Sequence, residues 1–246
     1  IANNGLISGK TMNTDIKNIL KETSTASIAS LLYKRGLRNQ YIQGVSRLGA
    51  KAERMVGPAF TLRYIPARED LNPITVFREP DHPQRVAVEE IPQGHVLIMD
   101  CRQDASAASA GSILATRLEF RGCAGVVTDG GLRDADEIAA LSMPSFCAKP
   151  SAPTNLTKHQ ALDINVPIGC GTVAVFPGDI AVGDGDGVII IPAHLAEEIA
   201  LEAKGMEHYE SWAIEQIKTG APVIGLYPMN DETRVKYEAF VAAEQE

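Results

Sequence analysis

Short apolar runs in the middle of the chain are the feature that most constrains its fold. Each is rich in β-branched residues and bounded by Gly, Pro or Asp, which is typical of buried strands. The runs are PAFTLRYI, HVLIMD, AGVVTD, TVAVF and GVIIIP. Between two of them lies SILATRLEFRG, whose apolar residues recur with a helical period. Strands joined by a crossover helix predict an α/β fold.

Helical patterns flank this region at both ends. The stretch TSTASIASLLYKRGLRN offers Ser/Thr caps, an apolar face and a glycine stop, and further helices are expected over residues 194–217 and 231–246. Residues 149–171 show little periodicity, so we expect a long functional loop or an irregular packing segment there. With no repeat or long linker in sight, we expect a single domain over residues 12–246. Residues 1–11 precede the first methionine and are expected to be a leader or added residues.

Charge and apolar content exclude several classes of protein. The formal net charge is −8, and a chain without a basic patch does not attract nucleic acid or an anionic membrane surface. No apolar run approaches the roughly 20 residues that span a bilayer, and the start lacks the pattern of a signal peptide. The four cysteines have no CxxC spacing, which indicates reduced thiols. We therefore expect a cytoplasmic protein that acts on a small molecule or a protein partner, without nucleic acid or membrane.

Two glycine-rich motifs are interpreted as turns. GCGTVA at residues 169–174 matches the loose dinucleotide fingerprint, but it opens a strand where the fingerprint opens a helix. GDGDG at residues 183–187 resembles a calcium loop, yet the position of the bidentate glutamate is occupied by Leu195. The five histidines have no metal-ligand spacing.

Arg133 and Asp134 are the strongest candidates for chemistry. They follow the strand AGVVTD through a double glycine, and ligands of open α/β folds gather at the carboxyl ends of strands. A guanidinium binds a carboxylate through two parallel hydrogen bonds, whereas a carboxylate beside it is useful when it binds a hard cation. The pair therefore indicates an oxo acid chelated to a metal. The alternative is that Asp134 only caps the helix that follows.

A second anion-favouring feature precedes this pair. Gly111 and Ser112 lie at the start of the predicted crossover helix, where the backbone N–H groups of Ser112, Ile113 and Leu114 are free to bind an anion. Both features belong to one βαβ-like unit and are expected to face the same crevice.

Lys149 is the one lysine with enough apolar neighbours to be a candidate for Schiff-base chemistry.

These residues carry a resemblance to a known family. The stretch AGSILATRLEFRGCAGVVTDGGLRDADEI, the later VPIGCGTVAVFPGDIAVGDGDGVIIIP and the strand VGPAFTL resemble the RraA-like family, over about residues 24–200. That family includes the regulators of ribonuclease activity A and the class II 4-hydroxy-4-methyl-2-oxoglutarate aldolases. The resemblance implies a three-layer β/β/α sandwich with flanking N- and C-terminal helices, assembled as a homotrimer or homohexamer with sites at subunit interfaces.

The resemblance also implies roles for the candidate residues. Arg133 would bind the carboxylate of a 2-oxo acid, Asp134 would hold Mg²⁺ or Mn²⁺, and Gly111, Ser112, Ile113 and Leu114 would form the substrate-binding helix mouth. The expected activity is a metal-dependent lyase, either retro-aldol cleavage or decarboxylation through a pyruvate enolate.

One position departs from the family pattern. Ser112 stands where the aldolases usually have an acidic residue, so Asp129, Asp104 or a neighbouring subunit would have to supply the missing charge.

Two other functions stay open: a non-catalytic regulator that binds a ribonuclease, and a metal-dependent sugar-acid or hydroxy-acid dehydratase. For the dehydratase, Ser151, Thr154, Asn155 and Lys158 would line the pocket.

Overall fold

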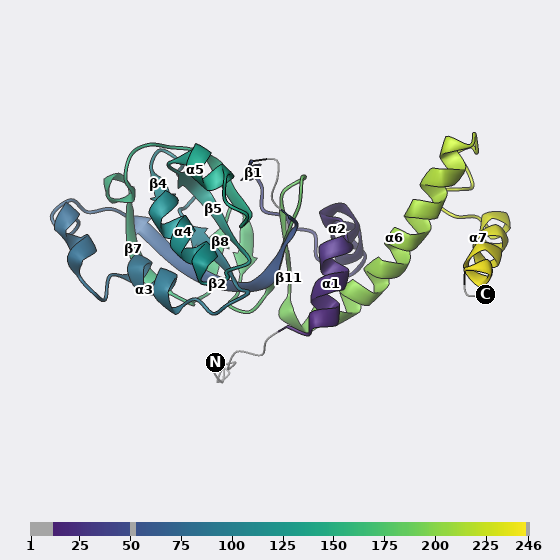
Figure 1. The fold of residues 1–246 in the computed structure, drawn as a ribbon, viewed down its shortest axis with the longest axis horizontal. Helices are drawn as coiled ribbons and strands as arrows, with labels where there is room; N and C mark the ends of the chain where they lie inside the picture. The colour runs from purple at the N-terminus through teal and green to yellow at the C-terminus, as the bar shows by residue number, and fades with distance from the viewer. Residues whose placement is uncertain (1–11, 50–52, 245–246) are drawn as a thin grey trace.

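The computed structural model describes residues 12–49 and 53–244 (Figure 1). The expected leader over residues 1–11 lies outside this range. In the described part of the chain the main sheet has nine strands, in the order β1-β6-β5-β3-β2-β10-β11, with β4 beside β5 and β7 beside β2. The strands are β1 (Ser46–Leu48), β2 (Met55–Pro66), β3 (Val96–Asp100), β4 (Ala108–Ala110), β5 (Gly125–Leu132), β6 (Ser145–Pro150), β7 (His159–Ile164), β10 (Ile180–Gly183) and β11 (Val188–Ile191).

The central strands are parallel and buried on both faces. Parallel pairing joins β2 to β3, β3 to β5, and β5 to both β4 and β6, whereas the outer pairs are antiparallel. Every residue of β5 is buried. Parallel strands that are covered on both faces have continuous apolar sequences. The apolar runs therefore predicted these strands correctly.

Alternate side chains of the central strands face two different cores. On one face, helices α3 (Pro83–Glu90), α4 (Ser112–Phe120) and α5 (Ala135–Ala139) pack against β3, β5 and β6. On the other, the two-stranded sheet of β8 (Ile168–Cys170) and β9 (Val173–Val175) packs against the same strands. The expected α/β class and its α, β and β layers are therefore confirmed.

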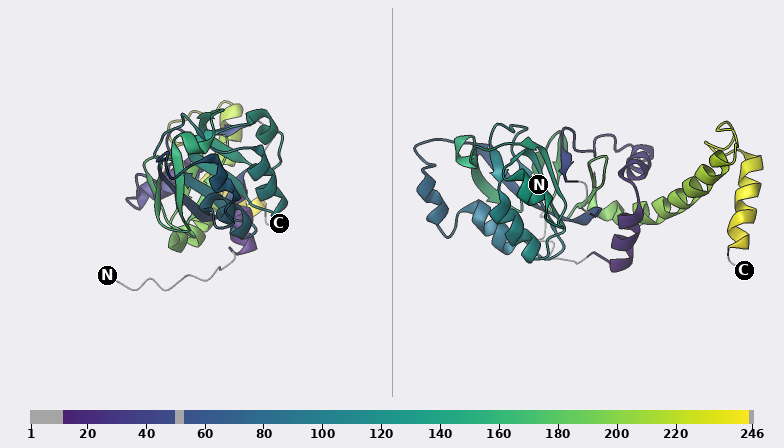
Figure 2. Two further views of the ribbon diagram at one scale, coloured as in Figure 1. Left: turned by 90° about the vertical axis from the view of Figure 1, so that its left-hand side faces the viewer. Right: turned by 45° about the horizontal axis from the view of Figure 1, so that its top comes forward.

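A helical arm extends from one end of the sheet. Helices α1 (Thr14–Glu22), α2 (Thr25–Lys34) and the first half of α6 (Ala196–Lys218) pack on β10 and β11. The second half of α6 carries α7 (Asp231–Ala243) away from the sheets, where the two helices form a separate small core (Figures 1 and 2). The predicted terminal helices are confirmed, and the domain limits of residues 12–246 stay a prediction.

The prediction of a long loop or an irregular segment over residues 149–171 is wrong, because this range contains regular elements. After β6, a short 3₁₀ turn, η2 (Asn155–Thr157), leads into β7 and then β8. Strand β7 is only half buried and mixes polar with apolar residues, so its sequence lacks the continuous apolar run of the central strands. A second 3₁₀ helix, η1 (Ile74–Arg78), precedes α3, and a third, η3 (Ala193–Leu195), precedes α6. The two glycine-rich motifs are turns, as expected.

The double glycine before Arg133 belongs to β5 and is not a turn. A Cβ on Gly130 would lie 2.6 Å from Cys101 Cβ, and a Cβ on Gly131 would lie 2.6 Å from Ser151 Cβ. Close packing against these neighbouring side chains therefore requires glycine at both positions. The strand runs through them to Leu132, so Arg133 and Asp134 follow its last residue directly.

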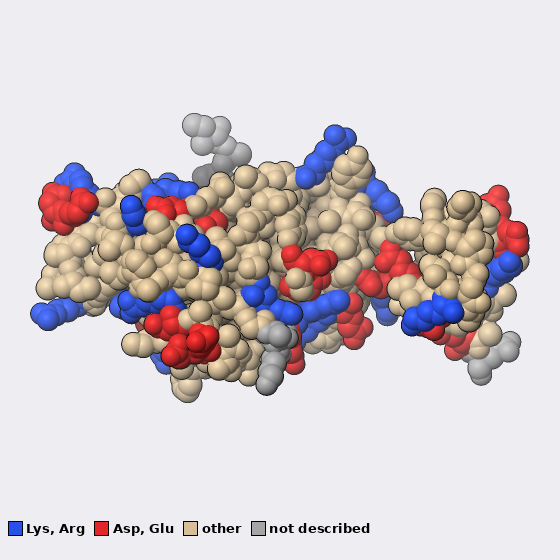
Figure 3. All heavy atoms as spheres, turned by 90° about the horizontal axis from the view of Figure 1, so that it is seen from above, with Lys and Arg blue, Asp and Glu red and all other residues tan. Residues whose placement is uncertain are grey.

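The surface and the helices give two further observations. Acidic and basic side chains are intermixed on the face seen in Figure 3. Among the described helices, none combines the length and the apolar character needed to cross a membrane.

Candidate active site

The predicted pair lies at the carboxyl end of β5, at the mouth of a pocket. The backbone N–H of Arg133 donates to Ala110 O at 3.1 Å, which ties the end of β5 to β4. Asp134 has left-handed backbone angles, φ 56° and ψ 48°. Non-glycine residues adopt this conformation rarely, although Asp tolerates it better than most. Both side chains remain about 40% exposed, so a ligand has access to them.

Asp134 does not cap the helix that follows it. It occupies the N-cap position of α5, yet its side chain makes no capping hydrogen bond there. Instead, Asp134 Oδ2 accepts hydrogen bonds from the backbone N–H and the hydroxyl of Ser112, at 3.0 and 3.1 Å. The carboxylate thus caps α4, where its charge also favours the positive end of the helix dipole. The expected free N–H of Ser112 is therefore occupied in this structure.

The side chains of Arg133 and Asp134 come so close to residue 111 that a glycine is needed there. A Cβ at this position would lie 2.7 Å from Asp134 Oδ2 and 2.8 Å from Arg133 Nε. Such distances are too short for non-bonded atoms, so only glycine leaves both groups in place. Arg133 Nε lies 3.7 Å from Asp134 Oδ2. The three positions that the sequence indicated therefore form one compact unit.

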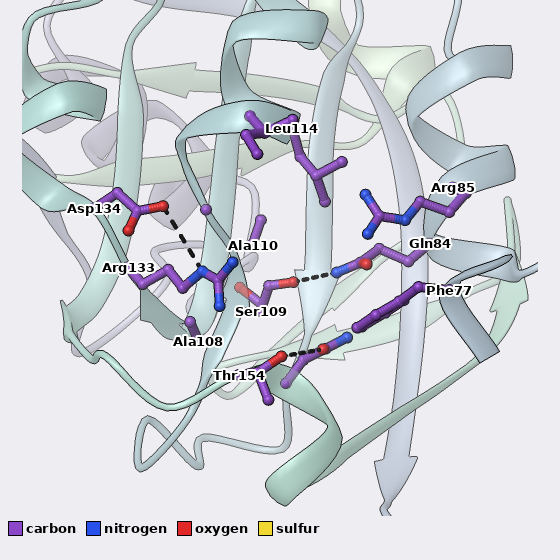
Figure 4. A pocket seen from close by; sticks show the side chains of 13 residues that line it. Phe77, Gln84, Arg85, Ala108, Ser109, Ala110, Leu114, Arg133, Asp134 and Thr154 are labelled. Carbon is purple, nitrogen blue, oxygen red and sulfur yellow. Dashed lines mark hydrogen bonds and ion pairs between the residues drawn. The ribbon is translucent and has the colours of Figure 1, made fainter. Parts of the chain in front are cut away.

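The pocket extends from this unit towards α3 (Figure 4). Ile113 and Leu114 line it from the first turn of α4, where backbone N–H groups have no acceptor within the helix. Figure 4 shows Arg85 and Phe77 on the wall opposite Arg133. The other lining residues are Gln84, Ala108, Ser109, Ala110, Gly111, Asp134, Thr154 and Asn155.

A buried hydrogen-bond network holds the floor of the pocket in place. The backbone carbonyl of Ser109 accepts from Gln84 Nε2 at 2.6 Å and from the Tyr64 hydroxyl at 3.1 Å. The Ser109 hydroxyl donates to Gly131 O at 2.9 Å, which links β4 to β5. Burial raises the pKa of Tyr64. Its hydroxyl therefore stays protonated and serves as a fixed donor.

Asp134 can supply one ligand to a divalent cation. Only one of its oxygens is engaged by Ser112, and magnesium is commonly held by one or two carboxylates together with water and substrate oxygens. Within the described residues, no group of three or more His, Cys, Asp or Glu side chains is placed to hold a metal. The residues present fit a partly hydrated Mg²⁺ or Mn²⁺ and not a metal enclosed by protein ligands.

The acidic residues expected to compensate for Ser112 do not reach it. Asp129 is buried, and its carboxylate accepts the backbone N–H groups of Cys101, Gln103 and Gly171 at 2.6 to 3.0 Å. Burial raises the pKa of Asp129. Asp104 accepts from the backbone N–H of Ser106 at 2.9 Å and does not line the pocket. Both residues therefore organise the loop after β3.

Two other expectations also need correction. Lys149 lies exposed on β6, so it lacks the desolvation that a Schiff-base lysine needs. Of the four residues expected to line a dehydratase pocket, Thr154 and Asn155 do so, whereas Ser151 and Lys158 do not. The prediction missed Phe77, Gln84, Arg85 and Ser109. They come from segments without a catalytic motif, and only the fold brings them to the pocket.

Comparison with known proteins gives a consistent set of relatives. A family model described as RraA-like: Aldolase/RraA matches residues 25–190. A protein of Halalkalibacterium halodurans named putative 4-hydroxy-4-methyl-2-oxoglutarate aldolase is 38% identical over 118 residues, which are 48% of this chain and 56% of that protein. One of the same name from Burkholderia mallei is 29% identical over 63% of this chain and 86% of its own length. The chain thus spans little more than half the length of the first of these relatives.

A solved structure agrees with these sequence matches. Streptomyces coelicolor RraAS2, described as an unusual member of the RNase ES inhibitor RraA protein family, has a TM-score of 0.73 and 27% identity. The match covers 84% of this chain and 98% of that structure. The fold and the sequence therefore point to the same set of proteins.

Proposed function

Because the chain belongs to the RraA-like family, Aldolase/RraA, we propose that it is a metal-dependent lyase acting on a 2-oxo acid. The reaction would be retro-aldol cleavage or decarboxylation, both of which leave an electron pair on the carbon next to the oxo group. The observation that carries the proposal is the packing of Gly111 against Arg133 and Asp134 at the mouth of a pocket. The relatives named as putative aldolases support the same reaction class.

Each residue of the unit has a task that follows from its chemistry. Arg133 would hold the carboxylate of the substrate through its planar donor fork. The N–H groups of Ile113 and Leu114 would donate to the same carboxylate or to the oxo group. Asp134 and water would hold Mg²⁺ or Mn²⁺, which would supply a Lewis acid. The neutral Ser112 hydroxyl orients the Asp134 carboxylate but is not an anionic base.

The site lacks a second acidic group, and a neighbouring copy of the chain could supply it. Among the described residues, Asp134 is the only acidic residue that lines the pocket. We propose a homotrimer or homohexamer in which a neighbouring copy supplies the second acidic group. Such an assembly would also explain why the side chain of Asp134 is about 40% exposed in a single copy.

The likeness to RraAS2 favours one second function. That protein is described as belonging to a family of ribonuclease inhibitors, and it matches 84% of this chain. A regulator would bind a ribonuclease by surface contact and would not need Arg133 or Asp134. Co-purification with a ribonuclease that persists in an Asp134→Asn variant would support this function.

The lyase is tested by screening 2-oxo acids and aldonic acids for release of pyruvate. Activity is expected with Mg²⁺ or Mn²⁺, and it should disappear with EDTA and return when the metal is restored. Treatment with pyruvate and borohydride should leave Lys149 unmodified. Activity that resists EDTA, or an adduct trapped on a lysine, would contradict the metal-dependent reaction.

A further inference from the structure

The segment that joins α6 to α7, residues 219–230, is an exposed apolar projection, and we call it the arm loop. It contains no charged residue, and it lies at the end of the arm farthest from the sheets (Figures 1 and 2). Ile224 is 92% exposed, and Val223 and Tyr227 are about half exposed. Apolar side chains that gather at an exposed place indicate contact with another molecule.

The small core behind the arm loop holds the loop in a fixed shape. Leu226 is buried in that core, and its backbone carbonyl accepts a hydrogen bond from the Tyr209 hydroxyl. The Tyr227 hydroxyl donates to Glu210 Oε1 at 2.9 Å, which ties the loop to α6 a second time. Ile224 therefore projects from a preformed loop, and little conformational entropy is lost when a partner binds it.

The same arm carries a groove of about 890 Å³ that is lined by α1, α6 and α7, and we call it the arm groove. Ile19, Leu201 and Val241 form part of its apolar surface. The arm loop of the same copy does not line the groove. Helix α6 separates Leu201 from Lys218, at the start of the loop, by about 25 Å. A copy therefore does not fill its groove with its own loop.

The charges of the arm groove and the arm loop are complementary. Apart from His208, the titratable groups of α1 and α6 and the carboxylate of α7 that line the groove are Glu22, Glu207, Glu238 and Lys204. The surplus of glutamates disfavours an acidic partner. The loop follows Lys218 and has no acidic residue before Asp231. Lys218 is paired with the exposed Glu215, and such a surface pair stabilises little, so the lysine is available to the glutamates of a groove.

We propose that the arm loop of one copy docks in the arm groove of a second copy, and that the contact is reciprocal. Each copy carries one loop and one groove, so a two-fold axis between two arms fills both grooves at once. The inference goes beyond the proposed function, because α6 and α7 lie outside the matched residues 25–190 and share no residue with the pocket around Arg133. Such a contact would join two of the proposed homotrimers into a homohexamer.

Particle mass tests the contact. By light scattering at micromolar concentration, the mass of Ile224→Asp is expected to be half that of the intact protein, because the aspartate brings a negative charge among the glutamates of the groove. Val235→Asp is the matched control. Val235 is 67% exposed on α7 but belongs to neither the loop nor the groove, so this variant should keep the intact mass. Circular dichroism and melting temperatures establish that each variant is folded.

Paired cysteines locate the contact. The native cysteines in the described part of the chain are all buried, so cysteines introduced at the surface supply the reactive thiols. A chain with both Leu201→Cys and Ile224→Cys should form disulfide-linked dimers under mild oxidation, whereas each single variant should not. Within one copy the two positions are too far apart for a disulfide. A double variant that cross-links no better than its single variants overturns the docking.

The outcomes keep the docking and the proposed function apart. Equal masses for Ile224→Asp and the intact protein overturn the docking and leave the proposed function intact. A different occupant of the groove gives the same result, since the mass would not depend on Ile224. An intact protein that pairs through its arms but releases no pyruvate supports the docking, while the proposed function fails.

Discussion

At the scale of single residues, Gly111 decides whether Arg133 and Asp134 can occupy their places. We expect Gly111→Ala to reduce turnover by at least about tenfold, because the added Cβ displaces two side chains that face the substrate. Gly169→Ala is the matched control, since a Cβ there meets nothing within 4 Å and its backbone is unstrained. Turnover and melting temperature are measured for both. Equal activity of the two variants would contradict the required close approach.

Asp134 has two roles that substitution can separate. Asn keeps an oxygen for the two donors of Ser112 and tolerates left-handed backbone angles, but it removes the negative charge. We therefore expect Asp134→Asn to melt close to the unmodified protein while kcat and Mg²⁺ affinity fall by orders of magnitude.

Asp134→Ala provides the comparison. It should lose the same activity and in addition about 1 kcal/mol of stability, because the cap of α4 is lost. Loss of stability with unchanged kcat and metal affinity would show that the residue is only structural.

Substitution of Arg133 should affect binding of the 2-oxo acid more than turnover. Arg133→Ala removes a charge-assisted hydrogen-bonded contact of about 1.5–3 kcal/mol, so KM for the 2-oxo acid should rise about ten- to a hundredfold. If the carboxylate is held equally in ground and transition states, kcat changes little. Steady-state kinetics check this, and a fall in kcat with unchanged KM would contradict the assigned role.

The residues of the site differ in how far the sequence predicted them. Arg133, Asp134 and Gly111 were found because they lie at the ends of elements with clear apolar patterns. Arg85 was not predicted to line the pocket, because its position there depends on how α3 packs beside β2. Pairing between strands far apart in the chain cannot be obtained from local periodicity.

At the scale of elements, the same physical limit applies. Strand β3 and helix α4 were predicted closely, since one is a continuous buried run and the other a crossover between parallel strands. Helix α1 was missed although Ile16 and Leu20 are spaced as on one helix face, because it is short and, apart from these two residues and Ile19, polar. Strand β7 was missed because half-buried strands with mixed residues show no distinct pattern.

The tip of the helical arm should unfold separately from the sheets. Trp212 is the chain's single tryptophan, and it packs with Tyr209, Tyr237 and Phe240 in the small core between α6 and α7. This core is separate from those of the sheet, so its opening costs less than global unfolding. We expect the tryptophan fluorescence transition in urea to precede the main circular-dichroism transition.

A variant at the arm tests this independence. Phe240→Ala should lower the midpoint of the fluorescence transition and leave the main transition in place, because Phe240 packs against the small core and belongs to none of the cores of the sheet. Coincident transitions in both proteins would show that the arm and the sheets unfold together.

At the scale of the whole molecule, the incomplete set of acidic ligands predicts association. A site completed by a neighbouring copy requires a particle of three or six times the chain mass of 26.4 kDa. Light scattering at micromolar concentration measures this mass directly. A monomer under these conditions would contradict a site shared between copies.

Helix α6 carries α7 away from the sheets, so one copy of the chain is elongated (Figures 1 and 2). A compact domain of 246 residues has a radius of gyration of about 18 Å, and a chain with a projecting arm exceeds it. An elongated particle diffuses more slowly than a sphere of equal mass and therefore leaves a sizing column early. A single chain would then elute like a small oligomer, and its Stokes radius would overstate its mass.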